Sequence, residues 1–184
     1  MVWRKSHDAD AADAMLARAA DYAEPLVAWR LWEIEDLEET ARLRSLYRIC
    51  FWPVGRPFEA RCEAHRFRLR RRARHSTPAA TCTCGVYGVP FAYVRKLAVN
   101  DRLLPPGRPL VLGTVSLWGE VVECERGWRA ALAYPDRLFM PLEFANVEHK
   151  ATGLEDYGVP VELLDTNRLV QALDSVGTGA GRAA

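Results

Sequence analysis

Apolar and polar positions form their clearest pattern near the middle of the chain, where two strands joined by a polar turn are predicted. Residues 110–124 predict one long strand, residues 125–127 a turn and residues 128–134 a returning strand. The apolar face of the returning strand carries Trp128, Ala130, Leu132 and Tyr134. We therefore predict an antiparallel β-hairpin in which Trp128 is largely buried.

Two glycines and a proline are expected to interrupt the regular strands of this region. Gly113 and Gly119 lie inside the first strand and indicate bends or bulges there. The sequence Tyr-Pro-Asp-Arg at residues 134–137 is typical of a turn or the start of a short helix. The hairpin is therefore expected to end at about residue 134.

Further strands are predicted before the hairpin. Residues 26–34 are strand-like, the acidic run 35–39 suggests a turn, and residues 42–49 alternate between an apolar face and an arginine face. Residues 85–99 are apolar and fit either a helix or a strand. Residues 157–161 predict a short extended piece.

Helices are predicted towards both ends of the chain. Asp8 can cap a helix over residues 8–23, which Pro25 would stop. Asp165 or Thr166 can cap a second helix that ends at about Ser175. The Gly- and Ala-rich residues 177–184 are expected to be disordered.

Length and composition fit one soluble domain. The chain has 184 residues, 49% of them hydrophobic and 27% charged, and it can bury one good-sized core. We predict a single α+β domain over residues 26–176, with a mainly antiparallel β-sheet core and a C-terminal helix, preceded by an N-terminal helical extension over residues 1–25.

Charge and cysteine content indicate which partners and which cellular compartment to expect. The net charge of +1 gives no overall field for nucleic acid or an anionic membrane, and no apolar run approaches the about 18 residues that span a bilayer. The N-terminus is acidic and Ala-rich where a signal peptide would be apolar. Five cysteines, an odd number, favour a reducing cytoplasm, and a cytoplasmic location is expected.

The chemistry-bearing residues gather in one segment. Cys62, His65, His75, Cys82 and Cys84 lie within 23 residues. Thiolates and imidazoles are the usual ligands of zinc, and Gly85 permits a sharp turn after the thiol pair. However, a single residue separates Cys82 from Cys84, whereas paired zinc ligands usually lie two to four residues apart. Buried, chemically inert cysteines and a redox or nucleophilic cysteine remain as alternatives.

Several sequence pieces resemble one family. They are WRLW at residues 29–32, WP at 52–53, ARC at 60–62, HSTP at 75–78, CTCGV at 82–86 and LWGEVVECERGWRAALAYP at 117–135. Together they resemble a family of uncharacterised actinobacterial proteins, over roughly residues 27 to 140. The resemblance implies no activity or cofactor, but it favours His75 over His65 as a ligand and makes Cys50 and Cys124 look incidental. If a transition metal is bound, we therefore predict one structural zinc on Cys62, His75, Cys82 and Cys84.

Three functions compete on this evidence. The leading hypothesis is a non-catalytic binding or adaptor module for an unknown protein or small-molecule ligand, with Trp118, Trp128 and Arg129 as candidate binding residues. The alternatives are a nucleic-acid-associated protein that uses the loop Arg61–Arg74, and an enzyme with a cleft beside residues 110–134. The sequence contains no Gly-rich phosphate loop, nucleophile elbow, HExxH or Walker pattern, and leaves catalysis undecided.

The arginine-rich loop generates a negative prediction. Residues 61–74 contain seven arginines but only one aromatic residue, Phe67, so a stacking platform for single strands is missing. We expect an exposed, mobile loop without a sequence-specific nucleic-acid site, because a run of charge is usually a solvated surface. A gel-shift titration tests this. Binding that survives 200 mM salt, about the level that abolishes weak phosphate contacts, and disappears when the arginines become serine would contradict it.

Overall fold

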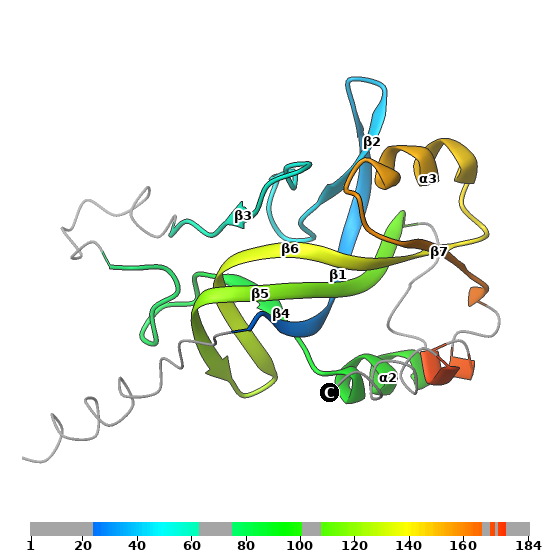
Figure 1. The fold of residues 1–184 in the computed structure, drawn as a ribbon. Coiled ribbons are helices and arrows are strands. Elements are labelled where there is room, and N and C mark those ends of the chain that lie inside the picture. Colours follow the sequence, from blue (N-terminus) through cyan, green and yellow to red (C-terminus); the bar gives the residue numbers. More distant parts are fainter. Residues whose placement is uncertain (1–23, 63–74, 101–107, 167–169, 172, 176–184) are drawn as a thin grey trace, which may run out of the picture.

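A long hairpin forms the centre of the computed structural model, which describes residues 24–62, 75–100, 108–166, 170–171 and 173–175 (Figure 1). Strand β5 (Leu110–Cys124) pairs antiparallel with strand β6 (Gly127–Pro141). The predicted hairpin is therefore confirmed. The turn or helix start predicted at residues 134–137 is wrong, because β6 continues through it to Pro141.

The hairpin accommodates Pro135 by a bulge. Thr114 lies opposite Arg137 and Val115 opposite Pro135, so Asp136 is an extra residue on β6. The Asp136 carboxylate accepts a hydrogen bond of 2.7 Å from the Thr114 hydroxyl. A second shift between Trp118 and Val121 contains Gly119, whose φ of +72° suits a bulge, as the sequence indicated.

Two strands extend the sheet on the β5 side. Strand β1 (Leu26–Leu37) pairs with β5, and strand β2 (Thr40–Arg44) pairs with β1, both antiparallel. The chain turns at Glu38 and Glu39, later than the sequence predicted. The predicted strand over residues 42–49 is wrong beyond Arg44, because Ser45 N–H donates to the Cys50 carbonyl (3.1 Å) and closes a loop. Two apolar residues of this loop, Tyr47 and Ile49, are 95% and 89% exposed.

Three short strands share the other edge of β6. Strand β4 (Val86–Gly88) pairs with residues 128–130, β3 (Phe58–Glu59) with residues 132–133, and β7 (Val161–Leu164) with residues 138–141. The β6–β7 pair is parallel, so the sheet is mixed rather than wholly antiparallel. β6 thus holds four separate partners in register.

The helices lie on opposite sides of the sheet (Figure 1). The ambiguous residues 85–99 form β4 and then helix α2 (Phe91–Val99), which starts after Pro90. Helix α3 (Val147–Glu155) was not predicted, because only Gly153 and Leu154 are buried along it. Residues 170–171 and 173–175 are helical, in line with the predicted C-terminal helix. The predicted N-terminal helix and tail lie outside the described residues.

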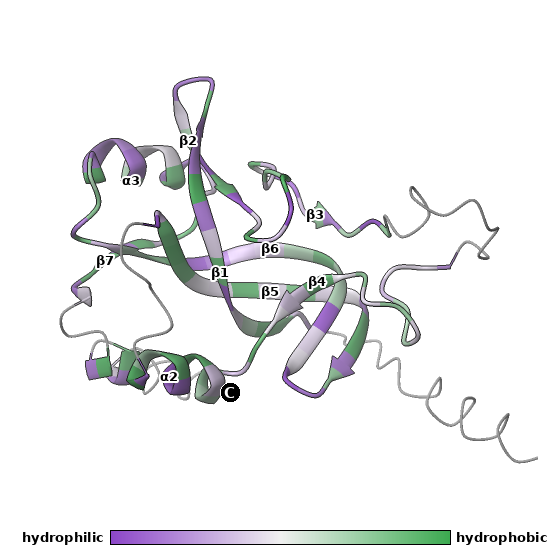
Figure 2. Cartoon of the chain, turned by 180° about the vertical axis from the view of Figure 1, so that it is seen from behind, coloured by the Kyte–Doolittle hydropathy of each residue, from purple (hydrophilic) through white to green (hydrophobic). Residues whose placement is uncertain are grey.

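Two apolar clusters, one on each face of the sheet, form the core. Hydrophobic residues follow β5 and recur along α2 (Figure 2). One cluster contains Trp32, Trp52 and Leu154 of α3, and the other contains Trp29 and Phe139 under α2. Alternation along β1 sends Trp29 and Trp32 to opposite faces. The described residues thus form a curled mixed sheet with few helices, consistent with an α+β domain. No helix in the described ranges is long and apolar enough to cross a membrane.

The prediction that the Trp128 side chain is largely buried is wrong. It is only partly buried, although it packs against the main cluster. It lies opposite Glu123, near the end of the hairpin, whereas β1 covers β5 only as far as Leu117. The large aromatic rings at the centre of the core are instead Trp32 and Trp52, which meet edge to face at 5.3 Å.

The core makes a direct prediction about Trp32. Trp32→Ala should lower the free energy of unfolding by about 3–5 kcal/mol, because it removes a fully buried ring. Trp118→Ala is the matched control on the neighbouring strand, since Trp118 is only partly buried. Urea unfolding followed by circular dichroism measures both. Equal losses for the two variants would contradict the described core.

Candidate metal centre

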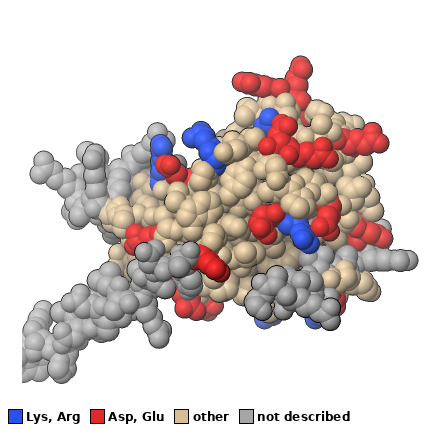
Figure 3. Space-filling model, viewed as in Figure 1, with Lys and Arg blue, Asp and Glu red and all other residues tan. Residues whose placement is uncertain are grey.

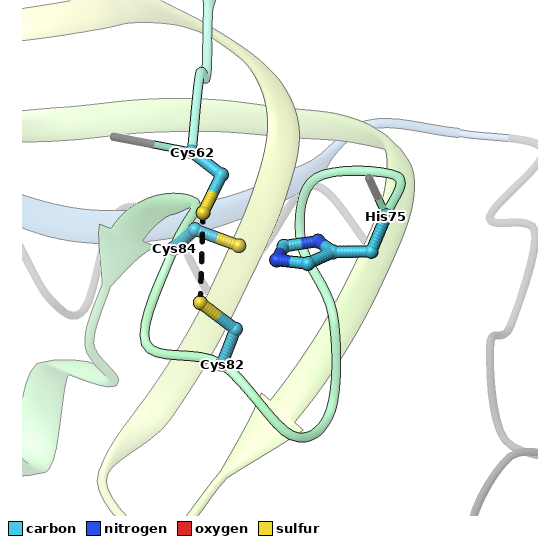
Figure 4. Close-up of side chains that lie close together, drawn as sticks. All are labelled: Cys62, His75, Cys82 and Cys84. Carbon is cyan, nitrogen blue, oxygen red and sulfur yellow. Dashed lines mark hydrogen bonds between the residues drawn. The ribbon is translucent and has the colours of Figure 1, made fainter. Parts of the chain in front are cut away.

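Three sulfurs and one imidazole converge beside the sheet (Figure 4). One ligand atom from each of Cys62, His75, Cys82 and Cys84 lies within 4.8 Å of all the others. The Sγ atoms of Cys62 and Cys82 are 3.7 Å apart. A tetrahedral zinc site with Zn–S bonds of about 2.3 Å requires an S–S distance of about 3.8 Å. The predicted ligand set is therefore brought together at metal-site spacing, and it can hold a metal ion.

Strand β6 places the two cysteine segments beside each other. Cys62 follows β3, and Cys82 and Cys84 precede β4; both strands pair with neighbouring parts of β6. Ala60 N–H extends the first pairing by donating to the Ala131 carbonyl at 2.8 Å. The ligands therefore come from segments that are separated in sequence and adjacent in the sheet.

The loop that carries Cys82 and Cys84 closes tightly. Cys82 N–H donates to the Ala79 carbonyl at 3.0 Å, which forms a turn. Gly85 then has a φ of +118°, and a Cβ atom there would lie 3.0 Å from Arg129 Cβ and 3.1 Å from Pro78 Cβ. The sharp turn that the sequence suggested at Gly85 is confirmed, and only glycine fits it.

Arg129 organises this loop from β6. Its side chain is buried, with 5% of the residue exposed. The guanidinium donates to the carbonyls of Cys82, Cys84 (2.7 Å) and Ala79 (3.3 Å), and Nε donates to Cys124 Sγ at 3.0 Å. Sequence reasoning placed Arg129 at a binding surface and treated Cys124 as incidental. A buried guanidinium that is satisfied by backbone carbonyls leaves no pattern in the sequence by which it could be found.

Local hydrogen bonds and burial shift the pKa values of three ligands. The pKa of Cys82 is lowered to about 7, mainly because the Cys84 N–H donates to its sulfur, whereas burial raises the pKa of Cys84. His75 Nδ1 lies 2.5 Å from the Ser76 carbonyl, and this hydrogen bond is the main cause of its raised pKa. The bond leaves Nε2 to face the sulfurs (Figure 4), an arrangement common among metal-binding histidines.

The same atoms have a second chemical interpretation. A thiol with a lowered pKa beside an imidazole also describes a nucleophilic cysteine. Two further sulfurs within 4.8 Å of that pair favour a metal shell instead, because a nucleophile needs neither of them.

The remaining predicted residues lie apart from this centre or outside the described chain. Trp118 and Trp128 are partly buried. Trp118 lies opposite Leu132 and Trp128 lies opposite Glu123, so the two tryptophans are not cross-strand partners in the hairpin. His65 and most of the Arg61–Arg74 loop lie outside the described residues. A cavity of about 790 Å³ is present, but its lining includes no residue of the 110–134 hairpin, where a cleft was suggested.

Comparison with known proteins adds no template for this site: no family model, curated protein or solved structure matches the chain.

Gly85 provides a test of the loop geometry. Gly85→Ala should cost about 1–3 kcal/mol of unfolding free energy, because alanine at this φ is strained and meets two side chains. Gly158→Ala is the matched control, since Gly158 also has a positive φ (+68°) but has nothing within 4 Å of the added Cβ. Chemical unfolding measures both, and a larger loss for Gly158→Ala would refute the described loop.

Proposed function

We propose that this protein is a non-catalytic binding module whose sheet is stabilised by one structural zinc ion. Cys62, His75, Cys82 and Cys84 are the ligands. The observation that carries the proposal is the convergence of three sulfurs and one imidazole within 4.8 Å. Zinc is the metal that this donor set suits best, since Cys₃His is one of its common structural shells.

A structural role follows from the number of ligands. Three thiolates and an imidazole fill the four positions of a tetrahedral zinc ion and leave none for substrate or water. The ion would join the end of β3 to the loop before β4, and so would link two strands that pair separately with β6. Metal binding would therefore add directly to folding stability.

The charge of the surroundings supports the same shell. Zinc with three thiolates and a neutral imidazole carries one net negative charge. The Arg129 guanidinium is buried nearby and donates to the backbone carbonyls of two ligands, Cys82 and Cys84. An anionic shell, partly buried like its ligands, would offset part of the cost of removing the Arg129 guanidinium from water.

A cavity bordered by the same loop supports a binding role. Thr83, Cys84 and Gly85 line this cavity of about 790 Å³, as do residues of the segment 45–61. This volume lies within the range of roughly 300–1,000 Å³ that is typical of small-molecule sites. The zinc centre would thus fix one wall of a ligand site and take no part in a reaction.

Metal analysis tests the proposal. Natively purified protein should contain about one zinc per chain. Cys82→Ser and Cys84→Ser should each lose the zinc and lower the unfolding free energy by several kcal/mol, on the order of 4, because loss of a metal is among the most damaging changes. His65→Ala and Cys50→Ser are the controls and should keep it. Elemental analysis and urea unfolding provide the two measurements.

One outcome would contradict the zinc proposal. A metal-free protein whose stability is indifferent to a chelator and to both cysteine substitutions would return these cysteines to the class of small buried hydrophobic residues.

A further inference from the structure

Arg30 of β1 lines the cavity beside the metal centre, together with residues of the segments 45–61 and 83–87. Alternation along β1 places Arg30 on the same face as Trp32. A charged side chain therefore occupies a position on the inner face of a core strand, where an apolar residue is the usual choice.

The Arg30 guanidinium is held firmly but is not neutralised. One terminal nitrogen donates to the Tyr87 carbonyl at 2.6 Å, and the group lies over the rings of Trp52 (5.2 Å) and Trp32 (5.9 Å). Its Nε atom is buried and has no hydrogen-bond partner in the described part of the chain. No described carboxylate forms a salt bridge with it. Burial also lowers its pKa to about 10.

The rest of the lining shares this positive character. Five of the lining residues are arginines and one is acidic; they are Arg30, Arg42, Arg48, Arg56, Arg61 and Glu59. Arg42 is paired with Asp156 at 2.9 Å, whereas Arg56 and Arg61 are exposed. Acidic side chains crowd the tip of the β1–β2 hairpin instead, and basic ones lie nearer to β3 (Figure 3). A concave site lined by one sign of charge attracts the opposite sign.

Apolar side chains complete the walls. Phe51 and Phe58 are partly buried, and Tyr87 is 44% exposed. All three line the cavity. An occupant of the cavity would therefore meet both cationic groups and flat apolar surfaces, which matches a molecule with one charged end and an apolar body.

We propose that this cavity binds a small organic anion, a carboxylate or a phosphate monoester, whose oxygens accept hydrogen bonds from the Arg30 guanidinium. Its apolar part lies against Phe51, Phe58 and Tyr87. The planar guanidinium fork suits both oxyanions. The inference rests on the proposed binding function and names its class of ligand. A bound anion would accept hydrogen bonds from the Arg30 guanidinium, which lines the cavity, and would neutralise a partly buried charge with which no described carboxylate forms a salt bridge.

The experiment titrates the full-length, zinc-loaded chain with benzoate, phenyl phosphate and the neutral benzyl alcohol. Calorimetry gives affinities, and the ¹⁵N resonance of Arg30 Nε reports the contact directly. We expect one of the two anions to bind in a salt-sensitive manner, at least about tenfold more tightly than the alcohol, and to shift that resonance. The tighter anion identifies the headgroup, carboxylate or phosphate.

Substitution separates the ligand role from a structural one. Arg30→Lys keeps the charge but lacks the planar fork, and should weaken binding of the preferred anion at least about tenfold while zinc content stays the same. Arg95→Gln on α2 is the control, because Arg95 pairs with Asp174 and is not among the residues that line the cavity. It should bind the anion like the wild type.

Two results would overturn the inference. One is a zinc-loaded wild-type chain whose Arg30 Nε resonance is unmoved by millimolar amounts of both anions, a measurement that does not depend on any variant folding. The other is anion binding that Arg30→Lys leaves unchanged. A zinc-free chain that still binds an anion through Arg30 would instead refute the zinc proposal and leave this one standing.

Discussion

Backbone pairing along β6 is the constraint on which the rest of the structure depends. One edge of this 15-residue strand carries β5, and the other carries β4, β3 and β7 in succession. The pairing of β3 and β4 with adjacent stretches brings Cys62 beside Cys82 and Cys84. Arg129, in the stretch that pairs with β4, holds the cysteine loop by donating to the carbonyls of Cys82 and Cys84. Without the shared strand, neither the ligand cluster nor the wall of the cavity would have a defined position.

The sequence predicted those parts whose signal is periodic or chemical. The β5–β6 hairpin follows from alternation over many residues, and the three cysteines with one histidine follow from the types of residue that thiolate–imidazole sites require. The choice of His75 over His65 rested on the family resemblance. Alternation failed over residues 42–49, because a strand also needs a partner and Ser45 closes a loop onto Cys50 instead. It also failed for β3, which has two residues, and for α3, which buries only two. Arg129, which is buried, and Arg30, which is partly buried on the inner face of β1, break the rule that charge lies outside, and only tertiary contacts explain them.

The cysteine loop borders both the candidate metal centre and the cavity. Cys84 contributes its sulfur to the ligand cluster, and the same residue lines the cavity, as does Arg30. Tyr87 connects them further: its hydroxyl donates to the Thr83 carbonyl at 2.8 Å, its own carbonyl accepts from Arg30, and Arg129 lies 5.9 Å from its ring. A change in one site therefore reaches the other through a few direct contacts, and any energetic coupling between them would be reciprocal.

The closeness of Cys62 and His75 has a consequence for how this chain can change over evolutionary time. Their ligand atoms lie within 4.8 Å of each other, so the two residues that flank residues 63–74 are held close together by their side chains. The entropic cost of closing such a segment rises only with the logarithm of its length, by about 0.6 kcal/mol for each doubling. Insertions, deletions or a grafted peptide should be tolerated there while the sheet keeps its register. The segment is a natural point for diversification and for engineering.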